Sequence, residues 1–146
     1  MATAAEARSA ISAAFDTYIA ELGQAQPVWD TKPATSAEGE DAWCARQVAE
    51  HIAGSGAFFG QGIARAAGLE GPTPARLELA DAASAVSETT RTHGLLMGVV
   101  DQLNDDHLAV EFDHPQLGKQ TIGGMLGIVS YHLNDHAKQL STLRTS

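Results

Sequence analysis

Two histidines stand four residues apart in the stretch SYHLNDHAKQL, Ser130 to Leu140. The stretch has apolar residues at helical spacing and contains no glycine or proline, so it is predicted to be helical. Residues four apart on a helix have Cβ atoms roughly 5–6 Å apart, which lets the imidazoles of His132 and His136 converge on one metal ion. Two core histidines bonded to other acceptors would give the same pattern, so a third ligand is needed to decide.

The apolar stripe of the same predicted helix indicates which way the two histidines point. The stripe consists of Ile122, Met125, Val129, Leu133, Leu140 and Leu143. His132 and His136 fall within it, so both side chains should point into the protein, where an imidazole must find a partner.

His51 is the candidate third ligand. It lies at the edge of an apolar stripe in an earlier predicted helix and should also face the interior. That stripe consists of Val48, Ile52, Phe59 and Ile63. Three histidines would leave coordination positions open for water or substrate, as catalytic sites do. Imidazole suits zinc, nickel, iron and copper alike, so the expected cofactor is one divalent ion of unspecified identity.

Four long amphipathic helices are predicted to position these histidines. They span residues 3–22, 44–68, 75–103 and 121–143. The third contains a heptad-like seam, typical of helices that pack at a shallow angle. The seam consists of Leu79, Ala83, Val86, Thr90, His93, Met97 and Val100. The sequence therefore predicts an all-α, up-down four-helix bundle that forms a single domain over residues 1–146.

The connections between these helices are uneven in length. About 18 residues, from Gln24 to Asp41, join the first two helices, and such long connections are often functional or mobile. The third and fourth helices are joined by a longer irregular connection, in which LAVEF reads as extended and HPQLG as a turn. We expect the acidic residues of SAEGED (residues 36–41) to face solvent, and no carboxylate stands out on the inward helix faces as a base.

Composition narrows the range of partners. The 146 residues include 18 acidic and 9 basic ones, giving a formal net charge of −9, which argues against a nucleic-acid or anionic-membrane partner. The longest apolar run, near Leu95 to Val100, is too short to span a bilayer, and the N-terminal stretch lacks the features of a secretory signal. The single cysteine, Cys44, excludes an internal disulfide, so a cytoplasmic location is expected.

The residues around the histidines resemble the DinB-like (DinB/YfiT) family. WCARQVAEHI, from Trp43 to Ile52, is similar to the family's Trp-Ser/Thr-x-x-Glu-x-x-x-His-Leu start of the second helix. HPQLGKQTIGGMLGIVSYHLNDHAKQL is similar to the stretch that leads into its His-x-x-x-His helix, down to the glutamine that follows, here Gln139. By matching position, the resemblance implies a four-helix bundle with a zinc, nickel or iron ion on three ligands. These are His51, His132 and His136.

One departure from the family pattern concerns the start of the second helix. The family places Ser or Thr at the cap and Glu three residues later, where this chain has Cys44 and Gln47. A thiol is a weaker hydrogen-bond acceptor than a hydroxyl, although Gln47 can still reach back to the cap. The departure concerns the cap and leaves the metal site untouched.

The resemblance also implies a class of function. The family includes S-transferases and isomerases that use a low-molecular-weight thiol, so a small-molecule substrate is expected. A transferase would activate such a thiol and a hydrolase a water at the same ion, and no residue separates the two hypotheses. The alternative is a non-catalytic metal-binding or stress-related interaction protein, and a homodimer is compatible with either.

Other residues have weaker claims on the site. His93 and Trp43 are candidates to line a substrate pocket. His93 could otherwise be a fourth ligand, a general base or a core histidine, and Trp43 could pack the end of the second helix. His107 and His114 fall in the irregular connection and are expected at the surface. A solvent-open pocket over the ion, lined by the third helix, would favour catalysis, whereas a fourth protein ligand would favour a structural ion.

Overall fold

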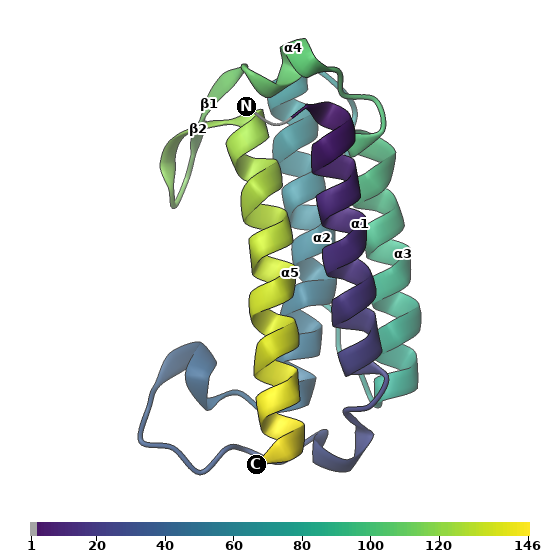
Figure 1. Ribbon diagram of the computed structural model, residues 1–146, viewed down its shortest axis with the longest axis vertical. Helices are drawn as coiled ribbons and strands as arrows, with labels where there is room; N and C mark the ends of the chain where they lie inside the picture. The colour runs from purple at the N-terminus through teal and green to yellow at the C-terminus, as the bar shows by residue number, and fades with distance from the viewer. Residues whose placement is uncertain (1–2) are drawn as a thin grey trace.

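The computed structural model describes residues 3–146, and four long helices packed side by side dominate it (Figure 1). The long helices are α1 (Ala4–Leu22), α2 (Ala45–Ala67), α3 (Ala82–Val100) and α5 (Ile122–Thr145). The shorter elements are η1 (Gln26–Val28), η2 (Gly39–Ala42), α4 (Asp105–Leu108), β1 (Glu111–His114) and β2 (Gly118–Thr121). The predicted all-α four-helix bundle is confirmed. Among the described residues, no helix combines the length and apolar character required to cross a membrane.

The long connection predicted between the last two long helices contains a β-hairpin. β1 and β2 pair as an antiparallel hairpin, with Glu111 opposite Thr121 and His114 opposite Gly118. Gly118 has φ of 74°, a left-handed conformation that glycine adopts readily after a turn. The turn that the sequence predicts here is confirmed. The predicted extended segment is confirmed for Glu111 and Phe112, whereas Leu108 is the last residue of the short helix α4.

The third helix is shorter than predicted, because it begins at Ala82 and not near residue 75. Asp81 caps its first turn by accepting a hydrogen bond from the backbone N–H of Ser84 at 2.7 Å. Just before the cap, the backbone N–H of Leu79 donates to the carboxylate of Glu50 at 2.9 Å. This distant acceptor satisfies a backbone group that a helix would otherwise have to pair, so residues 75–81 stay outside the helix.

The direction of α3 departs from the predicted up-down order at one connection, that between α2 and α3. The backbone N–H of Ala82 donates to the side chain of Gln26, which follows α1, and that of Arg46 donates to the carbonyl of Trp29. Both α2 and α3 therefore begin at the end of the bundle where α1 stops. The two helices run parallel, and the segment 68–81 returns along the length of the bundle between them.

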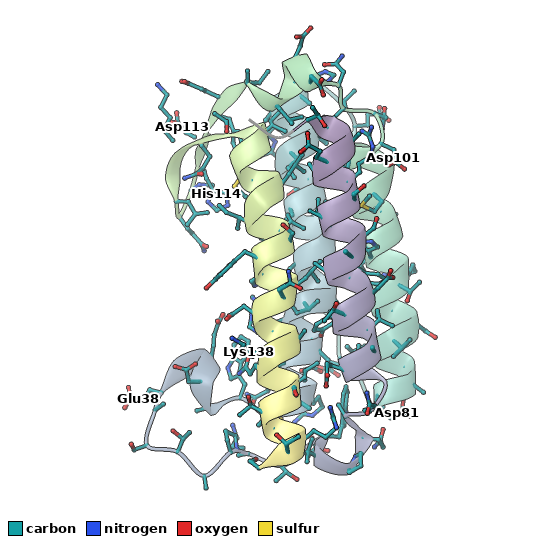
Figure 2. The ribbon with its side chains drawn as sticks, in the orientation of Figure 1. Glu38, Asp81, Asp101, Asp113, His114 and Lys138 are labelled. Carbon is teal, nitrogen blue, oxygen red and sulfur yellow. The ribbon has the colours of Figure 1, made fainter. Side chains whose placement is uncertain are left out.

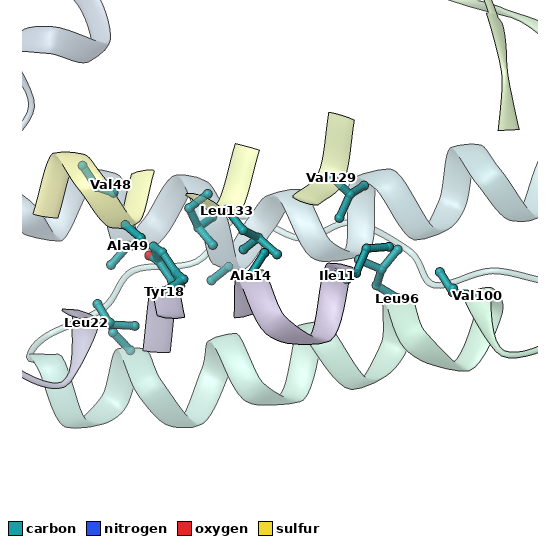
Figure 3. Close-up of a cluster of buried hydrophobic side chains, with 14 of the residues drawn as sticks. Ile11, Ala14, Tyr18, Leu22, Val48, Ala49, Leu96, Val100, Val129 and Leu133 are labelled. Atoms are coloured by element: carbon teal, nitrogen blue, oxygen red, sulfur yellow. The ribbon is translucent and has the colours of Figure 1, made fainter. Parts of the chain in front are cut away.

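The buried face of α3 is offset by one residue from the predicted seam. The buried residues are Ala82, Ala85, Thr89, Thr92, Leu96, Val99 and Val100. A Cβ on Gly56 of α2 would lie 3.1 Å from the carbonyl oxygen of Thr92, so the two backbones are close. Small side chains on α3 permit this approach, while larger ones fill the centre of the bundle, among them Ile11, Tyr18, Leu96 and Leu133 (Figure 3).

We predict that adding a methyl group at Gly71, in the returning segment, destabilises the folded protein. A Cβ there would lie 2.6 Å from the Cβ of Ala64, so Gly71→Ala should lower the free energy of unfolding by about 1–3 kcal/mol. Gly62→Ala is the control, because a Cβ there meets nothing within 4 Å, and the change should stabilise α2 by roughly 0.5–1 kcal/mol. Urea denaturation measures both, and equal shifts of the same sign would contradict the packing described.

Candidate metal centre

Three histidines from two helices converge at one point. His51 comes from α2, and His132 and His136 lie one turn apart on α5. One ligand nitrogen from each lies within 4.8 Å of the other two, and the Nε2 atoms of His51 and His132 are 2.9 Å apart. The three ring centroids are 4.7–5.1 Å from one another. The structure thus brings together the three histidines that the sequence singles out.

The cluster has a buried side and an open side. His136 is 1% exposed, whereas His51 and His132 are only partly buried. Aromatic rings surround them: Trp43 lies 5.2 Å from His51 and 6.4 Å from His136 between ring centroids, and Phe59 lies 5.6 Å from His132. Trp43, a predicted pocket residue, therefore contacts the cluster itself.

Gln139 fixes the tautomer of His136. The side-chain nitrogen of Gln139 donates to the backbone carbonyl of Glu40 at 2.7 Å, and a carbonyl can only accept. The side-chain oxygen of Gln139 is thereby left facing Nδ1 of His136 at 2.8 Å, so Nδ1 carries the proton and donates. Nε2 of His136 then presents its lone pair to the other two histidines, as a metal ligand must.

A carboxylate that the sequence analysis did not find also faces the cluster. Glu40, in η2, places its two oxygens 3.8 Å from Nε2 of His51 and 3.9 Å from Nε2 of His136. Glu40 is exposed, as expected for this acidic stretch, with 55% of its side chain accessible, and its carboxylate also lies beside two of the histidines. The sequence analysis missed this carboxylate because it lies in a loop. The loop is held beside the histidines by a hydrogen bond from Gln139, 99 residues away in the chain.

A wide groove opens from the histidines to solvent. Its volume is about 600 Å³, and its walls come from α2, α5, the segment 75–77 and the hairpin. His51 and His132 line it together with Phe58, Phe59 and Leu77. The third helix, predicted to line this opening, instead borders an adjoining small pocket of about 20 Å³, roughly enough for one water molecule. His93 and His132 both line that pocket.

The other histidines lie outside the cluster. His93 stacks on Phe15 with ring centroids 3.7 Å apart, and it is not part of the convergent set within residues 3–146. The Nδ1 of His107 accepts from the backbone N–H of Asn104 and so caps α4. His114 lies on the hairpin (Figure 2) and is one of the residues that line the groove.

Cys44 sits at the start of α2, where it is buried. Its backbone N–H donates to the side-chain oxygen of Gln47 at 3.0 Å. The reach-back that the sequence allows for Gln47 is therefore formed.

Burial favours the uncharged form of His51 and His132. It lowers the pKa of His132 to about 3, with further lowering by His136 and His51. Burial and the neighbouring His136 also lower the pKa of His51, opposed by the carboxylate of Glu40. Neutral imidazole is the form that binds a metal ion, so the lowered pKa values favour the form of these two rings that can act as ligands.

Comparisons with known proteins agree with this architecture. A family model described as the DinB superfamily matches residues 3–140. The crystal structure of TT2238, a four-helix bundle protein, is similar to the chain with a TM-score of 0.70 and 26% sequence identity. The match covers 96% of this chain and 99% of that one. No curated protein sequence matches the chain.

The lowered pKa of His132 predicts that the metal-free protein loses stability in mild acid. Between pH 6.5 and 3, protons bind this histidine in the unfolded chain but not in the folded one, so stability present above pH 6.5 is lost as the pH falls. The free energy of unfolding should drop by about 1–2 kcal/mol from pH 6.5 to 5, above the range in which most carboxylates titrate.

Urea denaturation with a chelator present measures this slope. His132→Gln is the matched comparison and should show a shallower dependence. A free energy that stays flat over this range, or an unchanged slope in the variant, would contradict the assignment.

Proposed function

The chain belongs to the DinB superfamily, and from that premise we propose that it is a metal-dependent enzyme whose divalent ion is held by His51, His132 and His136. The observation that carries the proposal is the convergence of three imidazole nitrogens from two helices within 4.8 Å. The ion is zinc, nickel or iron, all of which imidazole suits.

The chemistry of the donor set fits such an ion. Burial favours the neutral form of His51 and His132, and Gln139 directs the lone pair of His136 toward them. Without an ion, three imidazoles at this distance can satisfy one another only in part, because each neutral ring has one donor and one acceptor. A single cation accepts a lone pair from all three at once, which supports its presence.

Access to the cluster supports an enzyme over a purely structural ion. Three histidines leave coordination positions unfilled, and the groove of about 600 Å³ gives a small molecule a route to His51 and His132. When bound, a divalent ion polarises a carbonyl or lowers the pKa of a water or thiol. The protein would contribute apolar walls at Phe58, Phe59 and Leu77, which exclude water from the bound substrate.

The expected substrate is a small molecule attacked by a low-molecular-weight thiol or by water. The groove has room for either nucleophile, a thiol for a transferase or water for a hydrolase. Both activities are therefore assayed on the same protein. A non-catalytic metal-binding protein is the second candidate, and the carboxylate of Glu40 beside the cluster is the observation that favours it, because a fourth protein donor would close the site.

We predict that His136→Ala abolishes stoichiometric binding of zinc. It removes the one ligand that is both buried and fixed by Gln139, so elemental analysis after dialysis should fall from about one ion per chain to near zero. Excess zinc should raise the melting temperature of the unaltered protein but not of the variant, because the ion binds the folded state only. His114→Ala, outside the three-histidine cluster, should bind zinc like the unaltered protein, and full metal content in His136→Ala would refute the site.

Activity assays test the enzymatic part of the proposal. The metal-loaded protein should accelerate transfer of a low-molecular-weight thiol to an electrophile, or hydrolysis of an activated ester, and the chelated protein should lose at least about 100-fold of that rate. Glu38→Gln, at an exposed residue that does not line the groove, serves as the control. A protein that binds one ion tightly yet accelerates neither reaction would favour the non-catalytic candidate.

A further inference from the structure

Glu40 is the carboxylate that lies against the histidine cluster. Its Oε1 is 3.8 Å from Nε2 of His51 and its Oε2 is 3.9 Å from Nε2 of His136, so the two oxygens address two different ligands. Both contacts are made to the Nε2 atoms that face the centre of the cluster. Among the described residues, the groups whose ligand atoms all lie within 4.8 Å of one another are the three histidines alone, so Glu40 meets the cluster at its edge, beside His51 and His136.

The backbone of Glu40 is tied to the same network. Its carbonyl accepts a hydrogen bond from Gln139 at 2.7 Å and one from the backbone N–H of Trp43 at 3.1 Å. Gln139 in turn bonds to His136 at 2.8 Å, so one side chain orients a histidine and holds the loop that carries the carboxylate. The position of Glu40 is therefore coupled to that of the ligands.

The loop around Glu40 is otherwise lightly held. Residues 34–41 are all exposed, and η2 contains no buried residue. Few buried apolar contacts are characteristic of segments that open locally at low cost in free energy. The carboxylate can thus leave the cluster without disturbing the bundle, while α2 and α5 keep the three histidines in place.

We propose that Glu40 is a fourth, displaceable ligand to the ion, which closes the site at rest and swings away when a substrate or thiol binds. This inference rests on the proposed function, because it presupposes an ion on the three histidines. Carboxylate oxygen is an established zinc ligand beside histidine, and here it would come from a loop instead of a helix. The fourth position is then occupied in the resting protein and available in the working one.

Such a ligand also explains how a site with four protein donors can remain catalytic. An external ligand must first displace the carboxylate, so its apparent affinity is reduced by the fraction of molecules in which the site is closed. The groove begins where the carboxylate lies, since Glu40, His51 and His132 all line it. A molecule entering the groove therefore meets Glu40 beside the ion.

The test compares Glu40→Gln with Glu38→Gln. Glutamine keeps the size of Glu40 and removes the charge, and the side chain is exposed, so the variant should fold. Glu38 lies two residues earlier in the same loop, is exposed, and points away from α5 (Figure 2). Circular dichroism should show that both variants keep the helical content of the unaltered protein.

Two measurements on the metal alone report on the ligand. Competition with a chromophoric chelator gives the affinity for zinc, which should fall by at least about 10-fold in Glu40→Gln and stay unchanged in Glu38→Gln. The visible absorption of the cobalt(II)-loaded protein reports coordination geometry, and it should change only in Glu40→Gln. Titrating azide into the cobalt-loaded proteins should then show tighter binding to Glu40→Gln, because no carboxylate has to be displaced.

The outcomes separate this inference from the proposal beneath it. Zinc affinity, cobalt spectrum and azide binding that match Glu38→Gln in all respects would overturn the role of Glu40 and leave the three-histidine site standing. A cobalt spectrum that changes while azide binds no more tightly would overturn displacement. Failure of the unaltered protein to bind zinc or cobalt would overturn both.

Discussion

The buried imidazole of His136 is the constraint around which the site is arranged. At 1% exposure it can neither remain unpaired nor turn to solvent, so both ring nitrogens need partners. Gln139 satisfies Nδ1, and Nε2 faces the other histidines. His132, His136 and Gln139 follow one another at steps of four and three on α5, so one face of one helix carries two of the three histidines and the residue that orients one of them. The metal proposal adds a single cation that completes this arrangement.

Long helices carry the histidines, whereas the connections between helices form the open side of the site. Helices α2 and α5 carry the histidines, and the close packing of α2 on the small residues of α3 holds α2 in place. The open side is built from connections: residues 75–77 of the returning segment and the hairpin line the groove, and the loop before α2 brings in Glu40. Ligand geometry therefore depends on helices, whereas access depends on loops.

What the sequence predicts follows from helical periodicity. His132 and His136 lie on one apolar stripe and His51 lies beside another, so helical periodicity predicts that all three side chains face the interior. The structure places the three in one cluster. The start of α3 was missed because Glu50 and Gln26 accept hydrogen bonds from residues 29 and 56 positions away. Its buried face was misplaced because large apolar residues mark a stripe more strongly than Ala85 or Thr89. Glu40 was missed because its position depends on a contact across 99 residues.

Anomalous diffraction from a zinc-loaded crystal, recorded on both sides of the zinc absorption edge, tests the three-histidine site most directly. It locates the ion itself, without relying on a variant or an assay. The account predicts one dominant anomalous peak per chain, within bonding distance of nitrogen atoms from His51, His132 and His136, at roughly 2.0–2.1 Å. A crystal in which zinc binds only at surface carboxylates, with no peak between these histidines, would contradict it.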